Sequence, residues 1–577
     1  MTGVRVLFAD PETLVVEGEH GTWVVSAVAT NRVRDLVSNA DGLDAVCDDL
    51  AAQTEDAVVV FVSGTDRGGR VEAYRSATSS RDVFYLEASD GTLVLADHFR
   101  NAVRELAVGD RTVDRTALAD HLLFRSPVEP STYVAEVSRL GRGECIRWDG
   151  ADREWTRRVA DTLETVHRYS PGRAVDALGD ALEHVVRVGV RPGAHTMFSG
   201  GVDSTLLASY RRNAPSPVQV TVDAPEFRPE VVAAREAAAA IDASRTAVPV
   251  AEASFLDHLE AAVDALGLPP RYHQTVFTAA GFQSMEPGQY VNGQCADALF
   301  GLPGVKAARI ADWLGPVVDA GVAEWAAERL GGRAAAGYEA LAARRAQLQR
   351  PASSPESFAH ALAADVDPGA VAEVFDADVV RRRANRRVEY AGERANLDAD
   401  PTFPRQAEVG HLVDFLGDDA VNQWRQLGFV WGQDVVAPFR ARRVAQTALA
   451  VPADRRYVPR PGDSTPFAAK HVPKALLSRR VPEYDVRRGK HSGSLPIGRY
   501  VEPGGPLASA FERYEPPAVL SPASYDRHVA GHGSLTWELL TFSVWRDRVL
   551  LADDLEPVPG TETYHLRLPR EPAAPPT

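Results

Sequence analysis

The chain has 577 residues, of which 45% are hydrophobic and 25% charged, so it can bury large cores without disulfide or metal crosslinks. Its formal net charge of −16 argues against a protein whose whole surface binds nucleic acid, because that role needs clustered positive charge. The N-terminal residues lack a signal-peptide pattern, and no stretch of about 18 apolar residues predicts a spanning helix. We therefore expect a cytoplasmic protein that contacts no membrane.

Lysine is scarce in this sequence. The 63 basic residues include only four lysines: Lys306, Lys470, Lys474 and Lys490. Three of them lie within residues 470–490, in a chain that otherwise uses arginine, which indicates a need there for a compact ammonium group. The three cysteines show no metal-binding spacing and are expected to be buried, inert thiols: Cys47, Cys145 and Cys295.

Residues 1–168 are predicted to form a sheet-rich N-terminal domain. Short runs typical of strands occur at 23–25, 57–62 and 93–96, and Gly- and Asp-containing turns separate them. Residues 169–560 are predicted to form a second domain, in which strands and helices alternate.

The predicted strands of the second domain are 195–198, 218–222, 246–250 and 290–291, and the predicted helices are 174–188, 203–212, 229–241 and 255–266. This alternation predicts an α/β fold with a doubly wound parallel sheet and helices on both faces. The alanine-rich residues 305–450 are predicted to be mostly helical, and residues 561–577 to be a flexible tail.

The most informative motif lies between a predicted strand and a predicted helix, and it reads Ser199-Gly200-Gly201-Val202-Asp203-Ser204. Glycines let the backbone approach an anion closely, and N–H groups at a helix N-terminus add positive potential. The two serines supply hydroxyl donors, whereas Asp203 beside a phosphate implies an intervening Mg²⁺ ion. The motif therefore predicts a site for the pyrophosphate of ATP, although a capped strand-to-helix turn is the structural alternative.

This pattern resembles the PP-loop of ATP pyrophosphatases, which split ATP between its α and β phosphates. Residues 292–301, N-G-Q-C-A-D-A-L-F-G, resemble the S-G-E-G-A-D-E-L-F-G segment of asparagine synthetases and the related β-lactam synthetases. Residues 437–440 look like their R-x-P-F-L-D segment, and residues 470–496 are similar to their lysine-containing closing stretch.

The resemblance implies a role for each matching position. It implies that the pyrophosphate is held by Ser199, Gly200, Gly201, Asp203 and Ser204. Asp203 and Asp297 are implied as Mg²⁺ ligands, and Lys490 as the group that stabilises negative charge during the reaction. Gln294 stands where the family has a glutamate, and an amide cannot accept a proton from an attacking amine as a carboxylate can. Ala298 replaces a second family glutamate.

The N-terminal part is similar to the family's glutaminase domain at residues 91–99 and 140–148. The resemblance implies a sandwich of the N-terminal-nucleophile type, with layers αββα. Thr2 stands where glutamine-dependent members carry a cysteine nucleophile, so we expect a degenerate domain without glutaminase activity. A threonine nucleophile after removal of Met1 is the alternative.

The resemblance implies an ATP- and Mg²⁺-dependent, AMP-forming amide ligase, with aspartate as the default acid. The expected partners are a small-molecule carboxylate and ammonia or an amine. Nucleic acid is not expected as a partner, and whether the chain forms a homodimer stays open. Two alternatives stay open, namely a ligase for another acid, as in β-lactam synthetases and lasso-peptide cyclases, and a non-catalytic nucleotide-binding homologue. A tRNA-modifying PP-loop enzyme would be expected to carry catalytic cysteines and a basic surface, and this sequence shows neither feature.

Overall fold

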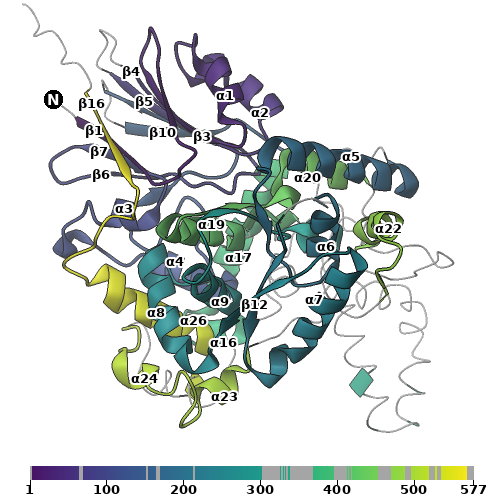
Figure 1. Ribbon diagram of the computed structural model, residues 1–577. Helices are drawn as coiled ribbons and strands as arrows, with labels where there is room; N and C mark the ends of the chain where they lie inside the picture. Colours follow the sequence, from purple (N-terminus) through teal and green to yellow (C-terminus); the bar gives the residue numbers. More distant parts are fainter. Residues whose placement is uncertain are drawn as a thin grey trace, which may run out of the picture.

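The structure is a computed structural model, and it describes residues 3–63, 69–150, 154–163, 169–211, 215–301, 325, 329, 332, 336–337, 368–395, 412–413, 415–417, 419–451, 470–487, 495–518, 527–528 and 535–567. The fold is mixed α/β, as the sequence predicted, with an upper sheet-rich part and a lower part of alternating strands and helices (Figure 1).

Two sheets form the N-terminal domain. One has the order β16-β1-β7-β6-β8, with strands Glu562–Arg567, Gly3–Phe8, Leu93–Ala96, Phe84–Glu87 and Ser138–Arg139. The other has the order β10-β9-β5-β4-β3-β2, with strands Glu154–Val159, Glu144–Asp149, Arg70–Arg75, Ala57–Ser63, Thr22–Ala27 and Leu14–Glu17. The predicted strand-like runs lie in β3, β4 and β7.

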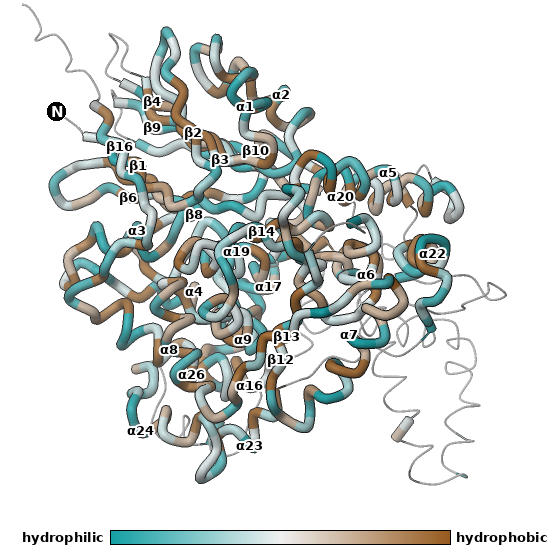
Figure 2. Tube along the Cα trace, in the orientation of Figure 1, coloured by the Kyte–Doolittle hydropathy of each residue, from teal (hydrophilic) through white to brown (hydrophobic). Residues whose placement is uncertain are grey.

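Strand β4 shows how the layers form. Its Val58 and Val60 belong to the core between the two sheets, whereas Val59 and Phe61 belong to the core under helices α1 (Thr30–Val37) and α2 (Cys47–Gln53). Alternate side chains of a strand point to opposite faces, so both faces of this strand are buried. Figure 2 colours the strand by the hydrophobic character of its residues. Helices α3 (Phe99–Val103) and α4 (Arg115–Phe124) share a core with the outer face of the other sheet. Helices thus pack on the outer face of each of the two stacked sheets, and the N-terminal-nucleophile type of the domain and its relation to a glutaminase stay predictions.

The C-terminal end of the described chain corrects one expectation. Residues 562–567 do not belong to a flexible tail: they form β16, which pairs antiparallel with β1 from Gly3↔Arg567 to Phe8↔Glu562. In Figure 1 this yellow strand lies beside the purple β1. The two ends of the chain thus complete one sheet, and residues 568–577 lie outside the described part.

The second domain is built on parallel strands. Its strands are β11 (His195–Thr196), β12 (Val218–Val222), β13 (Thr246–Val250), β14 (Gly288–Val291) and β15 (Gln433–Val436). The ladders are β11-β14-β15 and β12-β13, and a parallel bridge between Met197 and Val218 joins them. The sheet order is thus β13-β12-β11-β14-β15. Strand β15 was not predicted, because it lies within a segment that was expected to be helical.

Helices cover both faces of this sheet, as predicted. Tyr290 of β14 shares a core with α8 (Phe255–Leu266), α9 (His273–Phe282) and α19 (Ala420–Trp431). The next residue, Val291, shares a core with α5 (Pro171–Gly189), α6 (Val202–Ser209) and α7 (Arg228–Ala240). Since successive residues of a strand face opposite ways, the two helix groups lie on opposite faces.

The remaining elements are short or lie around this core. Further helices are α10 (Ala296–Phe300), α16 (Pro368–Ala372), α17 (Ala377–Ala395), α20 (Arg442–Leu449), α22 (His471–Arg480), α23 (Ile497–Val501), α24 (Ala510–Arg513) and α26 (Thr536–Trp545), which continues as a π-helical turn over Arg546–Leu550. Single 3₁₀ turns occupy Leu43–Ala45, Val108–Asp110, Pro225–Phe227, Glu252–Ser254 and Pro438–Arg440. Within the described ranges, no helix combines the length and apolar character that crossing a bilayer requires.

Candidate active site

The glycine-rich turn lies where an open parallel sheet reverses its strand order. Strand β11 has β12 on one side and β14 on the other, and the turn at residues 199–201 leads from β11 into α6. Crevices at the carboxyl ends of the strands bind ligands at such switch points. The turn from β14 into α10 ends at the same edge, so the two predicted motifs meet there.

The PP-loop turn depends on two glycines. Gly200 has a φ of +72°, and a Cβ atom at this position would lie 2.4 Å from Cα of Ala234 in α7. The hydroxyl of Tyr484 donates a hydrogen bond of 2.9 Å to the Gly200 carbonyl oxygen. Gly201 is the N-cap of α6, so the N–H groups of the first turn of the helix follow directly after the loop. Helix α7 and the segment 481–487 therefore both hold the backbone of this loop in place.

The two serines of the loop face each other. The hydroxyl oxygens of Ser199 and Ser204 are 3.2 Å apart, and the Gly201 N–H donates to Ser199 Oγ at 3.3 Å. Ser204 is buried, whereas Ser199 is exposed. This arrangement places hydroxyl and amide donors around one exposed turn, which is the donor set that an anionic phosphate requires.

The second motif packs directly on the first. A Cβ atom on Gly293 would lie 3.2 Å from both the Asp203 Cβ and the Ser204 backbone nitrogen. The N–H of Gln294 donates to Asn292 Oδ1 at 2.6 Å, which closes a tight turn. Cys295 then adopts a φ of 73° as the N-cap of α10, at a position where the related segment of asparagine synthetases carries a glycine. Gln294, within this turn, is partly exposed.

A lysine that was not assigned from the sequence joins the two motifs. Lys470 Nζ lies 2.9 Å from Asp297 Oδ1 and also contacts Asp203 Oδ2. Burial alone would lower the pKa of Lys470, but the carboxylates of Asp203 and Asp297 outweigh it and raise that pKa above its ordinary value. The side chain is therefore a charged ammonium group held between two acids.

The structure therefore brings together most of the predicted site. The five PP-loop residues, Gln294 and Asp297 lie at one sheet edge, whereas Lys490 falls outside the described residues. Tyr484 and Lys470 lie in the stretch 470–496 that was compared with the family, but that comparison assigned a role only to Lys490. The scarcity of lysine, with three lysines near residue 480, was the signal that could have pointed to Lys470.

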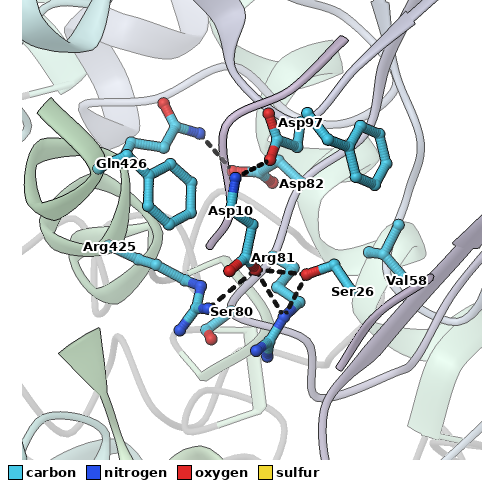
Figure 3. Close-up of a pocket in the computed structure, with 11 residues that line it drawn as sticks. Asp10, Ser26, Val58, Ser80, Arg81, Asp82, Asp97, Arg425 and Gln426 are labelled. Atoms are coloured by element: carbon cyan, nitrogen blue, oxygen red, sulfur yellow. Dashed lines mark hydrogen bonds and ion pairs between the residues drawn. The ribbon is translucent and has the colours of Figure 1, made fainter. Parts of the chain in front are cut away.

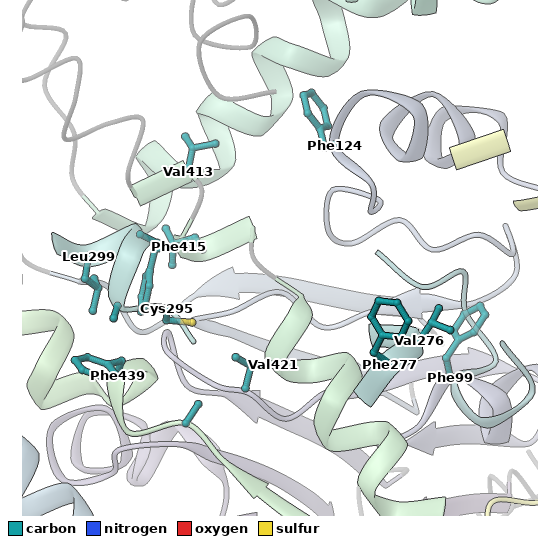
Figure 4. Packing of buried hydrophobic residues seen from close by; sticks show 14 of the residues in the cluster. Phe99, Phe124, Val276, Phe277, Cys295, Leu299, Val413, Phe415, Val421 and Phe439 are labelled. Carbon is teal, nitrogen blue, oxygen red and sulfur yellow. The ribbon is translucent and has the colours of Figure 1, made fainter. Parts of the chain in front are cut away.

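Apolar side chains pack around the start of α10, next to the candidate site. Cys295, Leu299, Phe415 and Phe439 belong to one core cluster and lie close together in Figure 4. The guanidinium of Arg440 donates to the Phe415 carbonyl oxygen at 2.9 Å and lies 3.6 Å from Cys295 Sγ. The segment after β15 is thus attached to Cys295, the N-cap of α10, which is the helix that carries Asp297.

The donor set fits a metal ion that arrives with a phosphate. Asp203 and Asp297 offer carboxylate oxygens, the ligands that Mg²⁺ prefers, close to a turn that offers phosphate donors. Across the described ranges, no cluster of three or more His, Cys, Asp or Glu side chains could hold a metal ion. Mg²⁺ in proteins is often held by one or two carboxylates together with substrate phosphates, which is the set that these residues could complete.

Charged side chains fill the contact between the two domains. Arg425 of α19 points toward Asp10, at the end of β1, and Arg81 approaches the same carboxylate from within the N-terminal domain (Figure 3). Burial raises the pKa of Asp10, but Arg425 and Arg81 outweigh it and hold that pKa below its usual value. Thr2, the position at which a nucleophile was considered, lies outside the described residues.

Comparison with known proteins identifies one family. The family model described as Asparagine synthase matches residues 173–547, which is more than half of the chain. A search for similar curated proteins found no match. The matched range contains the PP-loop, the turn at residues 292–295 and Lys470.

Proposed function

Because the chain belongs to the asparagine synthase family, whose members are ATP-dependent amide ligases, we propose that it forms an acyl-adenylate from a carboxylate and passes the acyl group to ammonia or an amine. Aspartate is the default acid, by family resemblance. The observation that carries the proposal is the meeting of Asp203, Asp297 and Lys470 beside the glycine-rich turn.

In this proposal the residues of the PP-loop bind the β and γ phosphates of ATP. The backbone N–H groups after Gly200, with the hydroxyls of Ser199 and Ser204, donate to the phosphate oxygens. Asp203 and Asp297 would hold Mg²⁺, which when bound offsets the negative charge of the triphosphate. An oxygen of the acid attacks the α phosphorus, the bond to the bridging oxygen breaks, and pyrophosphate leaves.

The amine then attacks the activated carbonyl carbon, loses a proton and displaces AMP. We assign to Lys490 the stabilisation of the negative charge that develops in these steps. We place Gln294 beside the attacking amine. Since an amide cannot accept the amine's proton, we propose that another base or solvent takes it. This points to an amine that binds largely deprotonated.

The first domain is proposed to have a structural role. Its expected nucleophile position holds Thr2 rather than cysteine, and ion pairs of Arg425 and Arg81 occupy its contact with the second domain. We expect that ammonium or an amine supports amide formation and that glutamine alone does not.

Exchange of labelled pyrophosphate into ATP tests the proposal, because adenylation is reversible before the amine reacts. The purified chain is incubated with MgATP, labelled pyrophosphate and one candidate acid at a time, beginning with aspartate. Acid-dependent exchange supports the ligase and identifies the acid, whereas ATP binding without exchange for any acid supports the non-catalytic alternative.

Variants assign the residues in the same assay. Asp203→Ala, Asp297→Asn and Lys490→Ala are each expected to lower exchange by about 100-fold or more, since each removes a charge aimed at the triphosphate. Asp176→Ala is the matched control, because this exposed carboxylate on α5 forms an ion pair with the exposed Arg479. Equal losses in the control and the site variants would contradict the assignment.

A further inference from the structure

We propose that Lys470 acts as a built-in cation, which holds Asp203 and Asp297 together while ATP is absent and keeps free divalent metal ions out of that position. The inference rests on the proposed function for the identity of the site, and it adds an order of events. The metal ion would bind these acids only together with a triphosphate.

The contact geometry supports this role. Carboxylate oxygens of Asp203 and Asp297 both lie within hydrogen-bond distance of a single nitrogen atom, Lys470 Nζ. The two oxygens are therefore no farther apart than two hydrogen bonds laid end to end. A metal ion that bridged the same two oxygens would have to occupy the place of the ammonium group.

The backbone of Lys470 is anchored rather than free to swing. Its N–H donates to the carbonyl oxygen of Phe300 at 3.0 Å, and its own carbonyl accepts from the Lys474 N–H at 3.0 Å. Phe300 ends α10, the helix that carries Asp297, so the lysine and its acid partner are tied by backbone as well as by charge. Lys470 is only 9% exposed.

Charge balance explains why the lysine would keep a metal ion out. Two neighbouring carboxylates repel each other at a partly buried site, and a nearby cation offsets that repulsion. Lys470 supplies this cation within the chain, so a free metal ion has to displace a tethered competitor. Magnesium that arrives with ATP brings phosphate oxygens as additional ligands, which gives it the advantage that the free ion lacks.

Manganese binding to the ATP-free full-length protein tests the inference. Mn²⁺ is a paramagnetic substitute for Mg²⁺, and titration followed by electron paramagnetic resonance counts the bound ions directly. Wild-type protein is expected to show no tight Mn²⁺ site without nucleotide. Lys470→Met, which keeps the length of the side chain and removes its charge, is expected to gain one site that binds at least about tenfold more tightly.

Three further proteins make the result specific. Arg479→Met removes a positive charge from the same helix at an exposed position, and it should leave Mn²⁺ binding unchanged. Lys470→Met combined with Asp203→Asn should lose the gained site, since one ligand is then neutral. Lys470→Gln repeats the test with a polar side chain, in case methionine disturbs folding, and circular dichroism checks each variant.

Two results would overturn the inference. The first is a tight Mn²⁺ site in the ATP-free wild-type protein that Asp203→Asn removes. The second is a folded Lys470→Met or Lys470→Gln protein that gains no site. Neither depends on turnover, so a failure of pyrophosphate exchange would reject the proposed function and leave this measurement valid.

Discussion

The guanidinium of Arg425, in the second domain, lies 2.9 Å from a carboxylate oxygen of Asp10, at the end of the first strand of the N-terminal domain. The same guanidinium lies 3.0 Å from Asp434 of β15. All three side chains are buried, so one arginine neutralises acids from both domains (Figure 3). Buried ion pairs of one arginine therefore link the two domains.

Replacing Arg425 by methionine is therefore expected to destabilise the whole chain. The change leaves two buried carboxylates without their shared cation, and breaking a buried ion pair on one side costs about 3–5 kcal/mol. Urea unfolding, followed by circular dichroism and by tryptophan fluorescence, measures the loss. Coincident transitions by the two probes would show that the domains unfold together.

Arg443→Met is the matched control, because Arg443 also reaches across the domain contact. Its Nε lies 3.2 Å from Glu55, but its side chain is 53% exposed. Exposed pairs contribute only about 0–1 kcal/mol, so the control should unfold almost like the wild-type protein. Similar losses for both variants would show that burial of the Arg425 pairs has no special weight.

Acid is expected to weaken a second buried cluster of ion pairs, around Glu129. Burial raises the pKa of Glu129, but the guanidinium groups of Arg75, Arg142 and Arg139 outweigh it and lower that pKa to about 2, from an ordinary value of 4.5. The unfolded chain therefore binds this proton at a higher pH than the folded chain does. Stability from Glu129 is full above about pH 4.5 and is lost as the pH falls toward 2.

Urea unfolding at a series of pH values from neutral to acid tests this sign. The free energy of unfolding should fall through that window, and Glu129→Gln should be less stable at neutral pH and show a shallower fall. A wild-type free energy that stays level down to about pH 2.5 would contradict the assignment.

The thiols of the N-terminal domain lead to a third prediction. Cys47 Sγ, at the start of α2, lies 3.3 Å from Cys145 Sγ on β9, and both side chains are buried. This separation exceeds the roughly 2.0 Å of a disulfide bond, so the thiols are reduced but close enough to join with little movement. The hydrogen bond with Cys145 lowers the pKa of Cys47, which favours the thiolate that attacks disulfides.

Exposure to a small-molecule disulfide should therefore oxidise this pair, with the reagent taking the two electrons. Peptide mass spectrometry should show Cys47 joined to Cys145, and the closed loop should stabilise the domain by about 4 kcal/mol. Cys145→Ser should abolish both effects. Persistence of both free thiols under conditions that oxidise an unfolded sample would show that the helix cannot approach the strand.

Local sequence patterns were sufficient to predict several strands of the second domain. Strands 218–222 and 246–250 were predicted with the bounds that the structure has, because short β-branched runs stand between clear turns. Strands β15 and β16 were not predicted, since each exists through pairing with a strand far away in the sequence, β14 and β1 respectively. A four-residue run such as Gln433–Val436 carries too little periodicity to reveal such a partner.

The candidate site likewise combines residues that short motifs singled out with a residue that only three-dimensional contacts reveal. The PP-loop was singled out because its glycines, serines and acid stand at a meaningful spacing, and Asp297 because its segment resembles a family motif. The structure places both at one sheet edge, and their roles stay predictions. Choosing between Lys470 and Lys490 required three-dimensional distances, since both lie in the same lysine-containing stretch and only contacts tell which ammonium reaches Asp203. The role of Lys490 stays a prediction, because the residue lies outside the described part of the chain.

Gly200→Ala is expected to remove nucleotide binding while leaving the chain folded. A methyl group there would meet the backbone of Ala234 at 2.4 Å, and the φ of +72° is unfavourable for any residue with a Cβ atom. The left-handed conformation and the clash together cost about 2–4 kcal/mol, enough to displace the loop rather than unfold the domain. Calorimetric titration with ATP should show affinity lower by about tenfold or more, since the loop amides no longer converge.

Gly193→Ala provides the control in the turn that precedes β11. A Cβ atom at Gly193 would have no heavy atom within 4 Å, so this change should shift stability by no more than about 0.5 kcal/mol and leave ATP affinity intact. The pair separates loop geometry from a general effect of replacing glycine near the sheet edge. Wild-type ATP affinity in Gly200→Ala would mean that the phosphates bind elsewhere, because an alanine cannot keep this loop in its present path against α7.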